Sequence, residues 1–599
     1  MRLGTGDREQ GTGGKEPNSQ ISPPDPGPRT PRRAWQGLVL LLVLGACIFG
    51  AGIGLRDPWP ADEPRFALVG KEMVETGEWL FPHRNGELYP DKPPVFFWLI
   101  AAVYAATGSL RLAFLLPSAL AGLGTLALTW DLARRLWGRR VAMLAGLALL
   151  ATLQFTLQAR TAQIDAVAAL WITLGVYGLA RHLLLGPAWR WWYVAFAAMG
   201  LGVITKGVGF LPVLLLVPWG IARWRRLANL PRFGFPWWHA AGGPLVMLAV
   251  IAAWLVPMVL VVAASGDPAL AAYRDNILLR QTATRYAAAW HHRNWVGYYL
   301  LQVIPWAWLP LTAALPWLLP AWWRRLRRGD ARTVVLLGWA ALVLLFFSAS
   351  PGKRGVYVLP VVPAFVLAAA PLLPGLLRRA RIRSLARWGA AAWSVVALAV
   401  AGAVPVLARI NPRRLEDLGV DPTLLVPPLA ALGVAGLVVT VLLWRRRGVE
   451  ALGAVIALSW LVTGLWVNPL LNAGRYPAPF MAEVARRIGP GAELGMLAWR
   501  EQFVLAADRP LVTFGYARRD LEVEAREGAA WLLAAPGRRL LVPTAGLPGC
   551  FDEAAVSLVG PRHGRTWYLA GPDAVTGACR SPLAVTASPP PPEPGQDRD

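Results

Sequence analysis

A few charged residues flank the long apolar runs of this chain, and their types are those of a reactive site. Asp62 and Glu63 follow the first apolar run, and Asp165 stands at the start of a later one. Lys206 and Lys353 lie in short polar breaks between apolar runs. Carboxylates and cations gathered on one apolar-walled face are suited to handling a phosphate together with a hydroxyl or a second phosphate. The other charged candidates are Arg65, Asp91, Lys92, His292 and Arg354.

Each of these residues also has a simpler interpretation. Asp62 and Glu63 fit a solvated acidic pair at a helix start, and Asp165 fits a helix cap. Lys206 and Lys353 fit side chains that reach toward lipid headgroups. The chemical interpretation therefore depends on whether the chain brings these residues to one place.

The composition is that of a polytopic α-helical membrane protein. The chain is 55% hydrophobic and only 16% charged, whereas soluble domains are about a quarter charged. Apolar runs of about 20 residues, the length of a membrane span, recur from Leu38 to Leu470. The net charge of +25 comes largely from short Lys and Arg clusters between these runs. That distribution indicates membrane topology and argues against nucleic-acid binding.

The pattern predicts about thirteen membrane spans within residues 34–470. Residues 1–33 are expected to form a disordered cytoplasmic tail, and Ala34–Leu55 an uncleaved anchor. The other spans are expected at 111–136, 141–158, 162–184, 190–205, 207–224, 240–263, 295–320, 332–347, 355–373, 387–408, 423–444 and 450–470.

Charge asymmetry predicts the orientation of these spans. With a cytoplasmic N-terminus, the six inner loops each carry two to five Lys or Arg, and the four short outer loops carry one to three. All the charged candidates then lie on the outer side. Two long outer segments, 56–110 and 264–294, mix charges with aromatic residues and prolines. In the first, "PPVFFWLIAAVYAATG" is apolar enough to lie along the membrane surface.

After Leu470 the long apolar runs give way to shorter elements that are typical of a soluble domain. "MAEVARRIG" reads as a helix, and "ELGMLAW", "RRLLVPT" and "RTWYLAG" read as strands, so residues 471–582 are expected to form a small extracytoplasmic α/β domain. The Pro-rich tail 583–599 is expected to be disordered. Cys550 and Cys579 pair only if this domain lies in an oxidising compartment, a question that the sequence leaves open.

The first outer segment resembles a known family. "DEPRFALVGKEMVETGEWLFPHRNGELYPDKPP", which begins at Asp62, is similar to the first outer loop of bacterial polyprenyl-phosphate-dependent glycosyltransferases of the GT-C class. The resemblance is strongest to the lipid A aminoarabinose transferases and the protein mannosyltransferase-like group. Further matching motifs are "QIDAV", "TKG", "RY…HRNWVGYYLLQVIPW" and "FSASPGKRGVYVLPVVP".

The resemblance implies the GT-C fold and an inverting transfer of a sugar from a polyprenyl-phosphate donor to an envelope acceptor, lipid A being one candidate. It implies Asp62 and Asp165 as the catalytic acids. It also assigns substrate binding to residues of the matched motifs, namely Glu63, Arg65, Tyr89, Asp91, Lys92, Lys206, Arg285, His292, Lys353, Arg354 and Tyr357. Asp91 replaces the Glu that is usual in the lipid A enzymes, and "RQTATRY" lacks their carboxylate, so the acceptor stays open.

No cofactor is expected. Stabilising charge on a leaving phosphate needs preorganised cations, so no metal is required, although a divalent ion held by carboxylates and His292 is an alternative. The expected partners are the lipid-linked sugar, a lipid or protein acceptor and membrane lipids, in the cell inner membrane. Two rival functions remain, a protein O-glycosyltransferase and a transporter of a lipid-linked sugar.

Overall fold

The structure is a computed structural model of the 599-residue chain. It describes residues 31–278, 294–410, 419–445, 447–515 and 520–580. The expected terminal tails therefore fall almost wholly outside the described residues. So do Arg285 and His292, in the second outer segment.

Long apolar helices dominate the described residues. Seven of them are long and apolar enough to cross a membrane, or up to nine if each of two bent helix pairs is one span. The seven are Leu110–Trp137, Ile164–Leu185 (α8), Trp237–Ser265 (α11), Ala331–Ala349 (α16), Ala380–Ile410 (α19), Pro422–Leu442 and Gly448–Ile488. Within these stretches the regular helices include α5 (Leu116–Trp137), α21 (Val426–Leu442) and α22 (Gly448–Val462). The chain is therefore a multi-pass membrane protein.

Shorter helices occupy the other predicted spans. These are α1 (Pro31–Gly50), α9 (Trp189–Lys206), η1 (Leu211–Leu215) with α10 (Leu216–Trp224), and α17 (Val361–Ala369) with η6 (Ala370–Leu372) and α18 (Leu373–Leu376). Every predicted span thus coincides with helical structure, while the number of crossings stays a prediction.

Two predicted spans are bent. Residues 141–158 form α6 (Arg139–Ala151) and α7 (Leu153–Ala159), which meet at 72°, because Thr152 between them is extended. The predicted span over 295–320 is bent more sharply. Tyr299–Ala307, which contains η3 (Tyr299–Val303) and α14 (Ile304–Ala307), makes an angle of 104° with Leu311–Arg327, which contains α15 (Leu315–Arg327). Pro310, which has no N–H to donate, lies in the break.

Small residues let the central helices pack closely. At Gly178 of α8, a Cβ atom would lie only 2.4 Å from the carbonyl oxygen of Trp191 in α9. Backbones that approach this closely are typical of membrane helices, where packing takes the place of a hydrophobic drive. This contact fixes α8 against α9, and these two helices carry Asp165 and Lys206.

The first outer segment folds into α2 (Asp62–Thr76), a hairpin of β1 (His83–Arg84) and β2 (Glu87–Leu88), and α3 (Val95–Thr107). The hairpin turn is Asn85-Gly86, with φ of 54° and 79°, the positive angles that a two-residue type I′ turn requires. The carboxylate of Glu72 accepts both turn N–H groups, at 2.6 and 3.3 Å. The hairpin is thereby attached to α2.

The C-terminal residues form a mixed α/β unit. Its sheet has the order β4-β3-β5-β7-β6, with β3, β4 and β5 parallel and β7 antiparallel to both β5 and β6. The helix and three strands read from the sequence are present as α24, β3, β5 and β7. The elements are α24 (Ala478–Ile488), β3 (Glu493–Met496), α25 (Glu501–Ala506), β4 (Leu511–Thr513), α26 (Leu521–Leu533), β5 (Arg538–Pro543), β6 (Ser557–Arg562), β7 (Arg565–Ala570) and α27 (Gly577–Arg580).

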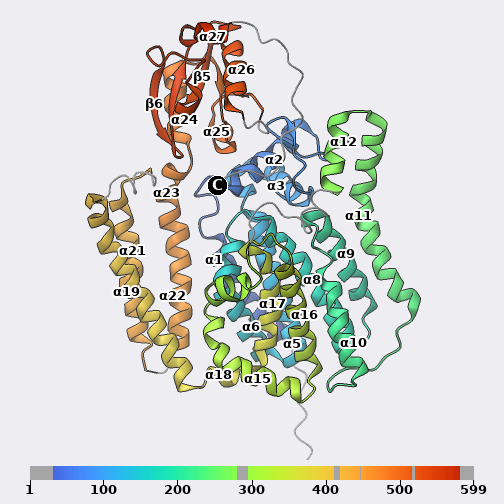
Figure 1. Cartoon of the computed structure of the whole chain (residues 1–599). Helices are drawn as coiled ribbons and strands as arrows, with labels where there is room; N and C mark the ends of the chain where they lie inside the picture. The colour runs from blue at the N-terminus through green and yellow to red at the C-terminus, as the bar shows by residue number, and fades with distance from the viewer. Residues whose placement is uncertain (1–30, 279–293, 411–418, 446, 516–519, 581–599) are drawn as a thin grey trace, which may run out of the picture.

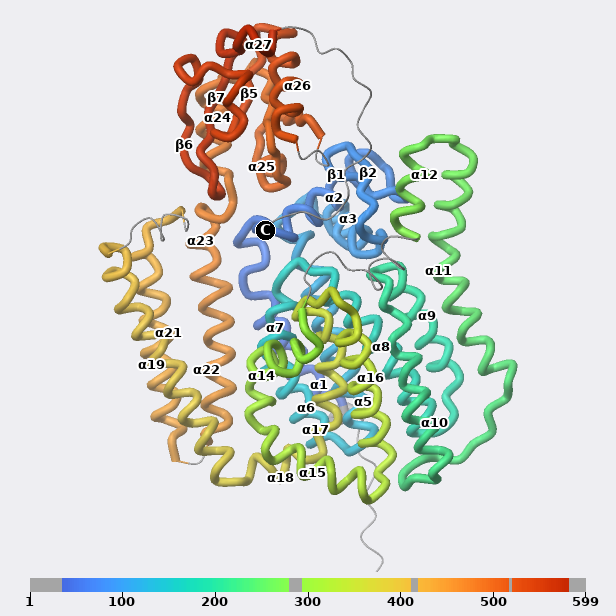
Figure 2. The backbone as a smooth tube through the Cα atoms, viewed as in Figure 1, coloured from blue at the N-terminus to red at the C-terminus, as the bar shows by residue number. Residues whose placement is uncertain are grey.

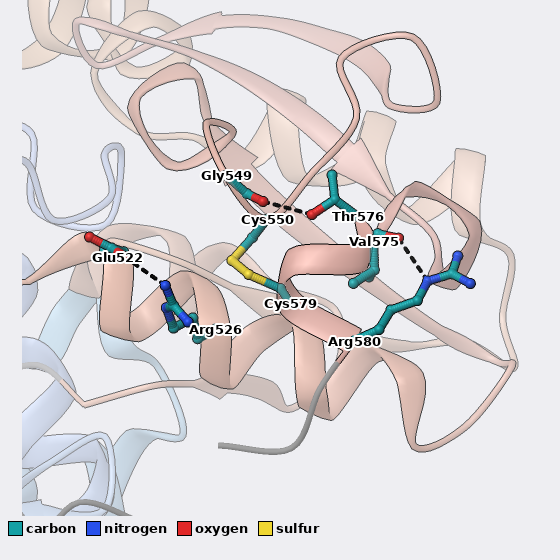
Figure 3. Close-up of a disulfide and its surroundings, with 8 residues drawn as sticks. All are labelled: Glu522, Arg526, Gly549, Cys550, Val575, Thr576, Cys579 and Arg580. Atoms are coloured by element: carbon teal, nitrogen blue, oxygen red, sulfur yellow. Dashed lines mark hydrogen bonds and ion pairs between the residues drawn. A yellow bond between two sulfur atoms is a disulfide. The ribbon is translucent and has the colours of Figure 1, made fainter. Parts of the chain in front are cut away.

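A disulfide joins Cys550 to Cys579 of α27, which settles the pairing that the sequence left open. Figure 3 shows the bond beside two hydrogen bonds of the same segment. The Thr576 hydroxyl donates to the Gly549 carbonyl at 2.6 Å, and the Arg580 Nε donates to the Val575 carbonyl at 2.9 Å. The end of the sheet unit is thus closed covalently.

The α/β unit sits over one end of the helix bundle. Figures 1 and 2 show α2 and α3 between the bundle and this unit, with α25 directed at α2. The Arg-rich ends of α10 and α15 lie at the opposite end. The helices α19, α21 and α22 form a group to one side. The bundle therefore has one end rich in Arg clusters and one end capped by the first outer segment.

Candidate active site

Asp62 begins α2 and faces two guanidinium groups. Its Oδ1 lies 3.3 Å from Arg65 Nη2, one helical turn along α2. Its Oδ2 lies 3.4 Å from Arg354 Nη2, which comes from the segment between α16 and α17. The Arg354 side chain is 42% exposed, whereas Asp62 is only 19% exposed. A carboxylate and an accessible cation separated by 292 residues of chain thus meet at the end of the bundle.

Asp165 and Lys206 form a second charged pair. Asp165 lies in the first turn of α8, Lys206 is the last residue of α9, and their side chains are bonded to each other. The ammonium of Lys206 also lies 4.6 Å from the ring centroid of Tyr357, a cation–π distance. The close packing of α8 and α9 places the start of one helix beside the end of the other.

One short segment, residues 353–357, reaches both charged pairs. Arg354 contacts Asp62, and Tyr357 contacts Lys206. The segment is held by Gln154, whose amide donates to the Gly355 carbonyl at 2.7 Å. Buried Lys353 donates to the carbonyls of Ser350 and Asn294, at 2.6 and 2.8 Å. Burial lowers the pKa of Lys353.

Glu63 lies next to Asp62 but faces the protein interior. Its carboxylate is bonded to both terminal nitrogens of buried Arg56, one of them at 2.7 Å. It also accepts the backbone N–H of Trp59 at 3.0 Å and that of Ala162 at 3.1 Å. Ala162 precedes Asp165 by three residues, so Glu63 ties the start of α2 to the start of α8.

The remaining predicted residues of the first segment surround α2. Tyr89 is fully buried, with its ring 5.8 Å from that of Phe97. Lys92 donates to the Asp91 carbonyl at 3.0 Å, and both side chains are half-buried. Of the thirteen predicted site residues, the eleven that the structure describes lie at this end of the bundle, while Arg285 and His292 are outside the described residues.

A second set of polar residues around the site was not predicted from the sequence. Asn472, after α22, accepts the Asp57 N–H at 2.9 Å and the Trp59 indole N–H at 3.0 Å. Arg111 pairs with Asp57 at 2.7 Å. Since these partners are 54 to 415 residues apart, only the fold could bring them together.

Glu501, from α25 of the α/β unit, is the other residue that sequence reasoning missed. It lies 2.5 Å from Arg84 and 3.6 Å from Arg65. Burial lowers the pKa of Arg65, but Tyr89, Glu501 and Asp62 raise it more, so the net direction is upward. Arg65 is therefore held as a cation between the α/β unit and Asp62.

Across the described ranges, no group of three His, Cys, Asp or Glu side chains is placed to hold a metal ion. Asp62, Glu63 and Asp165 each face a cation instead. Arginine and lysine beside carboxylates, at a half-exposed surface, are suited to bind an anionic group and to orient a polar group next to it.

Known proteins share both the sequence pattern and the architecture. Residues 91–256 match the family model described as dolichyl-phosphate-mannose-protein mannosyltransferase. The undecaprenyl phosphate-alpha-4-amino-4-deoxy-L-arabinose arabinosyl transferase of Aeromonas salmonicida is 33% identical over 344 residues, covering 55% of this chain and 58% of that protein. The protein of the same name numbered 1 in Pseudomonas fluorescens (strain Pf-5) is 28% identical over 501 residues. The match covers 78% of this chain and 84% of that protein.

The crystal structure of ArnT from Cupriavidus metallidurans bound to undecaprenyl phosphate matches 92% of this chain and all of that one, with a TM-score of 0.68 and 22% identity. The chain has the GT-C fold. The resemblance to the aminoarabinose transferases is confirmed. The transferase of the same name from Aeromonas hydrophila is 31% identical over 344 residues, and the match spans only 58% of that protein. Their activity, substrates and partners therefore come to this chain only as a proposal.

Proposed function

We propose that this protein is an inverting glycosyltransferase that moves a sugar from a polyprenyl-phosphate donor to an envelope acceptor. The observation that carries the proposal is the meeting of Asp62, Arg354, Asp165 and Lys206 around residues 353–357. A transporter needs no such set of carboxylates and cations at one end of its bundle, since transporters bind their substrates near the membrane midplane. The relatives named as arabinosyl transferases support the same class of reaction.

In the reaction, an oxygen of the acceptor attacks the anomeric carbon of the sugar. The bond between that carbon and the phosphate oxygen breaks, and the electron pair leaves with the polyprenyl phosphate. Negative charge thus builds up on the leaving phosphate, where preorganised cations stabilise the transition state. Arg354 is the best placed cation, because its side chain is accessible. Lys206, at the end of α9, contacts Tyr357 of the same segment as Arg354, and Lys353 holds that segment in place.

Asp62 acts on the acceptor in this proposal, in one of two ways. If the acceptor is a hydroxyl, Asp62 removes its proton, a contribution of about 10²–10⁴ in rate. If the acceptor is an ionised phosphate, no proton is removed and Asp62 orients the reacting groups. Asp165 binds the sugar from the start of α8. Asp91 and Lys92 border the same site and are assigned to substrate binding, as are Arg65, Tyr89 and Tyr357.

The site lies at the outer face of the inner membrane in this proposal. The Arg-rich ends of α10 and α15 then face the cytoplasm, as the positive-inside rule favours. The α/β unit lies in the periplasm, and its Cys550–Cys579 disulfide supports that compartment. Residues 34–470 then form the membrane domain, with about thirteen spans and a cytoplasmic N-terminus, and residues 471–582 form the periplasmic domain.

The acceptor that we propose first is lipid A, because the proteins similar in sequence to this chain are aminoarabinose transferases. Protein O-glycosylation is the alternative, since the family model matched by residues 91–256 is that of a protein mannosyltransferase. Mass spectrometry of lipid A from cells with and without the protein separates these two acceptors.

The decisive test uses purified protein in detergent with polyprenyl-phosphate sugars and lipid A. Asp62→Asn is expected to abolish transfer while the protein stays folded in the membrane. Asp508→Asn is the matched control, because Asp508 is exposed in the α/β unit and pairs only with its neighbour Arg509 among the described contacts. Full transfer by Asp62→Asn would overturn the assignment, and no transfer by the wild type with any donor would overturn the function.

A further inference from the structure

The α/β unit places one carboxylate in the first outer segment. Glu501 begins α25, and only 4% of its surface is exposed. Its Oε1 lies 2.5 Å from Arg84 Nη2 and 3.6 Å from Arg65 Nε. Burying a carboxylate is costly unless cations compensate it. The position of Glu501 therefore depends on the two arginines of the membrane-side segment.

Arg65 lies between two carboxylates from different parts of the chain. Nη2 of Arg65 contacts Asp62, and Nε contacts Glu501. Arg65 Nε and Glu501 Oε1 form no hydrogen bond, so Glu501 acts on Arg65 through its negative charge at 3.6 Å, inside a buried contact where charges interact strongly. The place of Glu501 thus sets the direction in which Arg65 meets Asp62.

The contact between the α/β unit and the first outer segment is well packed around Glu501, so it can hold Glu501 and Arg65 in these positions. Leu68 of α2 is buried in the same apolar cluster as Phe503 and Trp567 of the α/β unit. The Asn85 amide at the tip of the hairpin donates to the Thr513 hydroxyl at 2.5 Å. The Arg84 guanidinium lies 5.6 Å from the Trp499 ring centroid. Figure 2 shows α25 as the part of the unit that approaches α2.

We infer that Glu501 is a positioning residue for the reaction, through which the α/β unit orients Arg65 and thereby Asp62. The inference rests on the proposed function and deepens it, because it makes the C-terminal unit part of the active site. Glu501 itself need not touch either substrate. Without its charge, Arg65 keeps Asp62 as its nearest described carboxylate and moves toward it, away from the acceptor-facing geometry.

The test compares Glu501→Gln, Glu501→Asp and wild type in the purified transfer assay, over a range of donor concentrations. The Gln variant is expected to lose on the order of 10- to 100-fold in kcat, as small misplacements of reacting groups do, with little change in the KM for the donor. The Asp variant keeps the charge and is expected to recover part of the loss. Glu493→Gln is the matched control, because Glu493 forms an exposed pair with Arg538 in the same unit.

A second measurement separates positioning from mere attachment of the unit. The substitutions Asn85→Cys and Thr513→Cys, made in a Cys47→Ser background, report by their rate of cross-linking whether the hairpin still touches the unit. The inference predicts unchanged cross-linking of the Glu501→Gln variant together with its loss of kcat. Equal loss of both would show a structural role only and overturn it, as would full kcat in the Gln variant. Wild-type turnover in the same assay shows separately whether the proposed function holds.

Discussion

Replacing Glu63 by Gln gives a direct measure of what holds the two charged pairs together. The carboxylate of Glu63 serves four donors, two of them on Arg56 and the others the N–H groups of Trp59 and Ala162. Gln is nearly the same size but removes the charge and turns one acceptor into a donor. Arg56, only 4% exposed, then loses its charged partner, and its hydrogen bond to the Asp57 carbonyl, at 3.2 Å, is the one described bond that the substitution leaves untouched.

The magnitude follows from these contacts. Breaking one partner of a buried ion pair costs about 3–5 kcal/mol, and the remaining amide oxygen of Gln recovers about 1 kcal/mol as an acceptor. The net loss of stability is therefore about 2–4 kcal/mol, which is roughly 30- to 1,000-fold in the folded-to-unfolded ratio. Loss of the Ala162 contact also loosens the start of α8, so transfer is expected to fall even though Asp62 and Asp165 are unchanged.

The assay is thermal or denaturant unfolding of the purified protein in one detergent, followed by tryptophan fluorescence. Glu75→Gln is the matched control on the same helix, because Glu75 is 47% exposed and pairs only with Lys71 one turn away in the described contacts. An exposed pair contributes at most about 1 kcal/mol. If Glu63→Gln unfolded at the same point as Glu75→Gln, the structural role of Glu63 would be refuted, and direct substrate contact would take its place.

Three further outcomes follow from the same contacts. Asp165→Asn and Lys206→Met are each expected to reduce transfer strongly, and the double variant to be little worse than either, since the two side chains act as a pair; additive losses would show separate roles. Cys550→Ser with Cys579→Ser opens a loop of 29 residues and should destabilise the α/β unit by about 3–4 kcal/mol, seen as faster proteolysis, whereas Cys47→Ser should change nothing. EDTA is expected to leave transfer intact, because the site carboxylates face cations; loss of activity that added Mg²⁺ restores would contradict this.

The sequence was most informative where the signal is local. A run of about 20 apolar residues must be helical in a membrane, because every backbone N–H and C=O needs a partner within its own segment, so helices appeared at all the predicted spans. The short segments that form β3, β5 and β7 were likewise predicted from local patterns. The bends at Thr152 and near Pro310 were missed, because apolarity alone carries no information on helix direction.

The sequence by itself determined which residues are candidates and, through the order of the spans, that they face one end of the bundle. Only the tertiary structure decided which of them meet. It paired Asp62 with Arg354 and Asp165 with Lys206, turned Glu63 inward onto Arg56, and brought Glu501 from the α/β unit to Arg65. The physical reason is that three of these four contacts join charges 41 to 436 residues apart and depend on helix packing, which no short pattern in the sequence encodes.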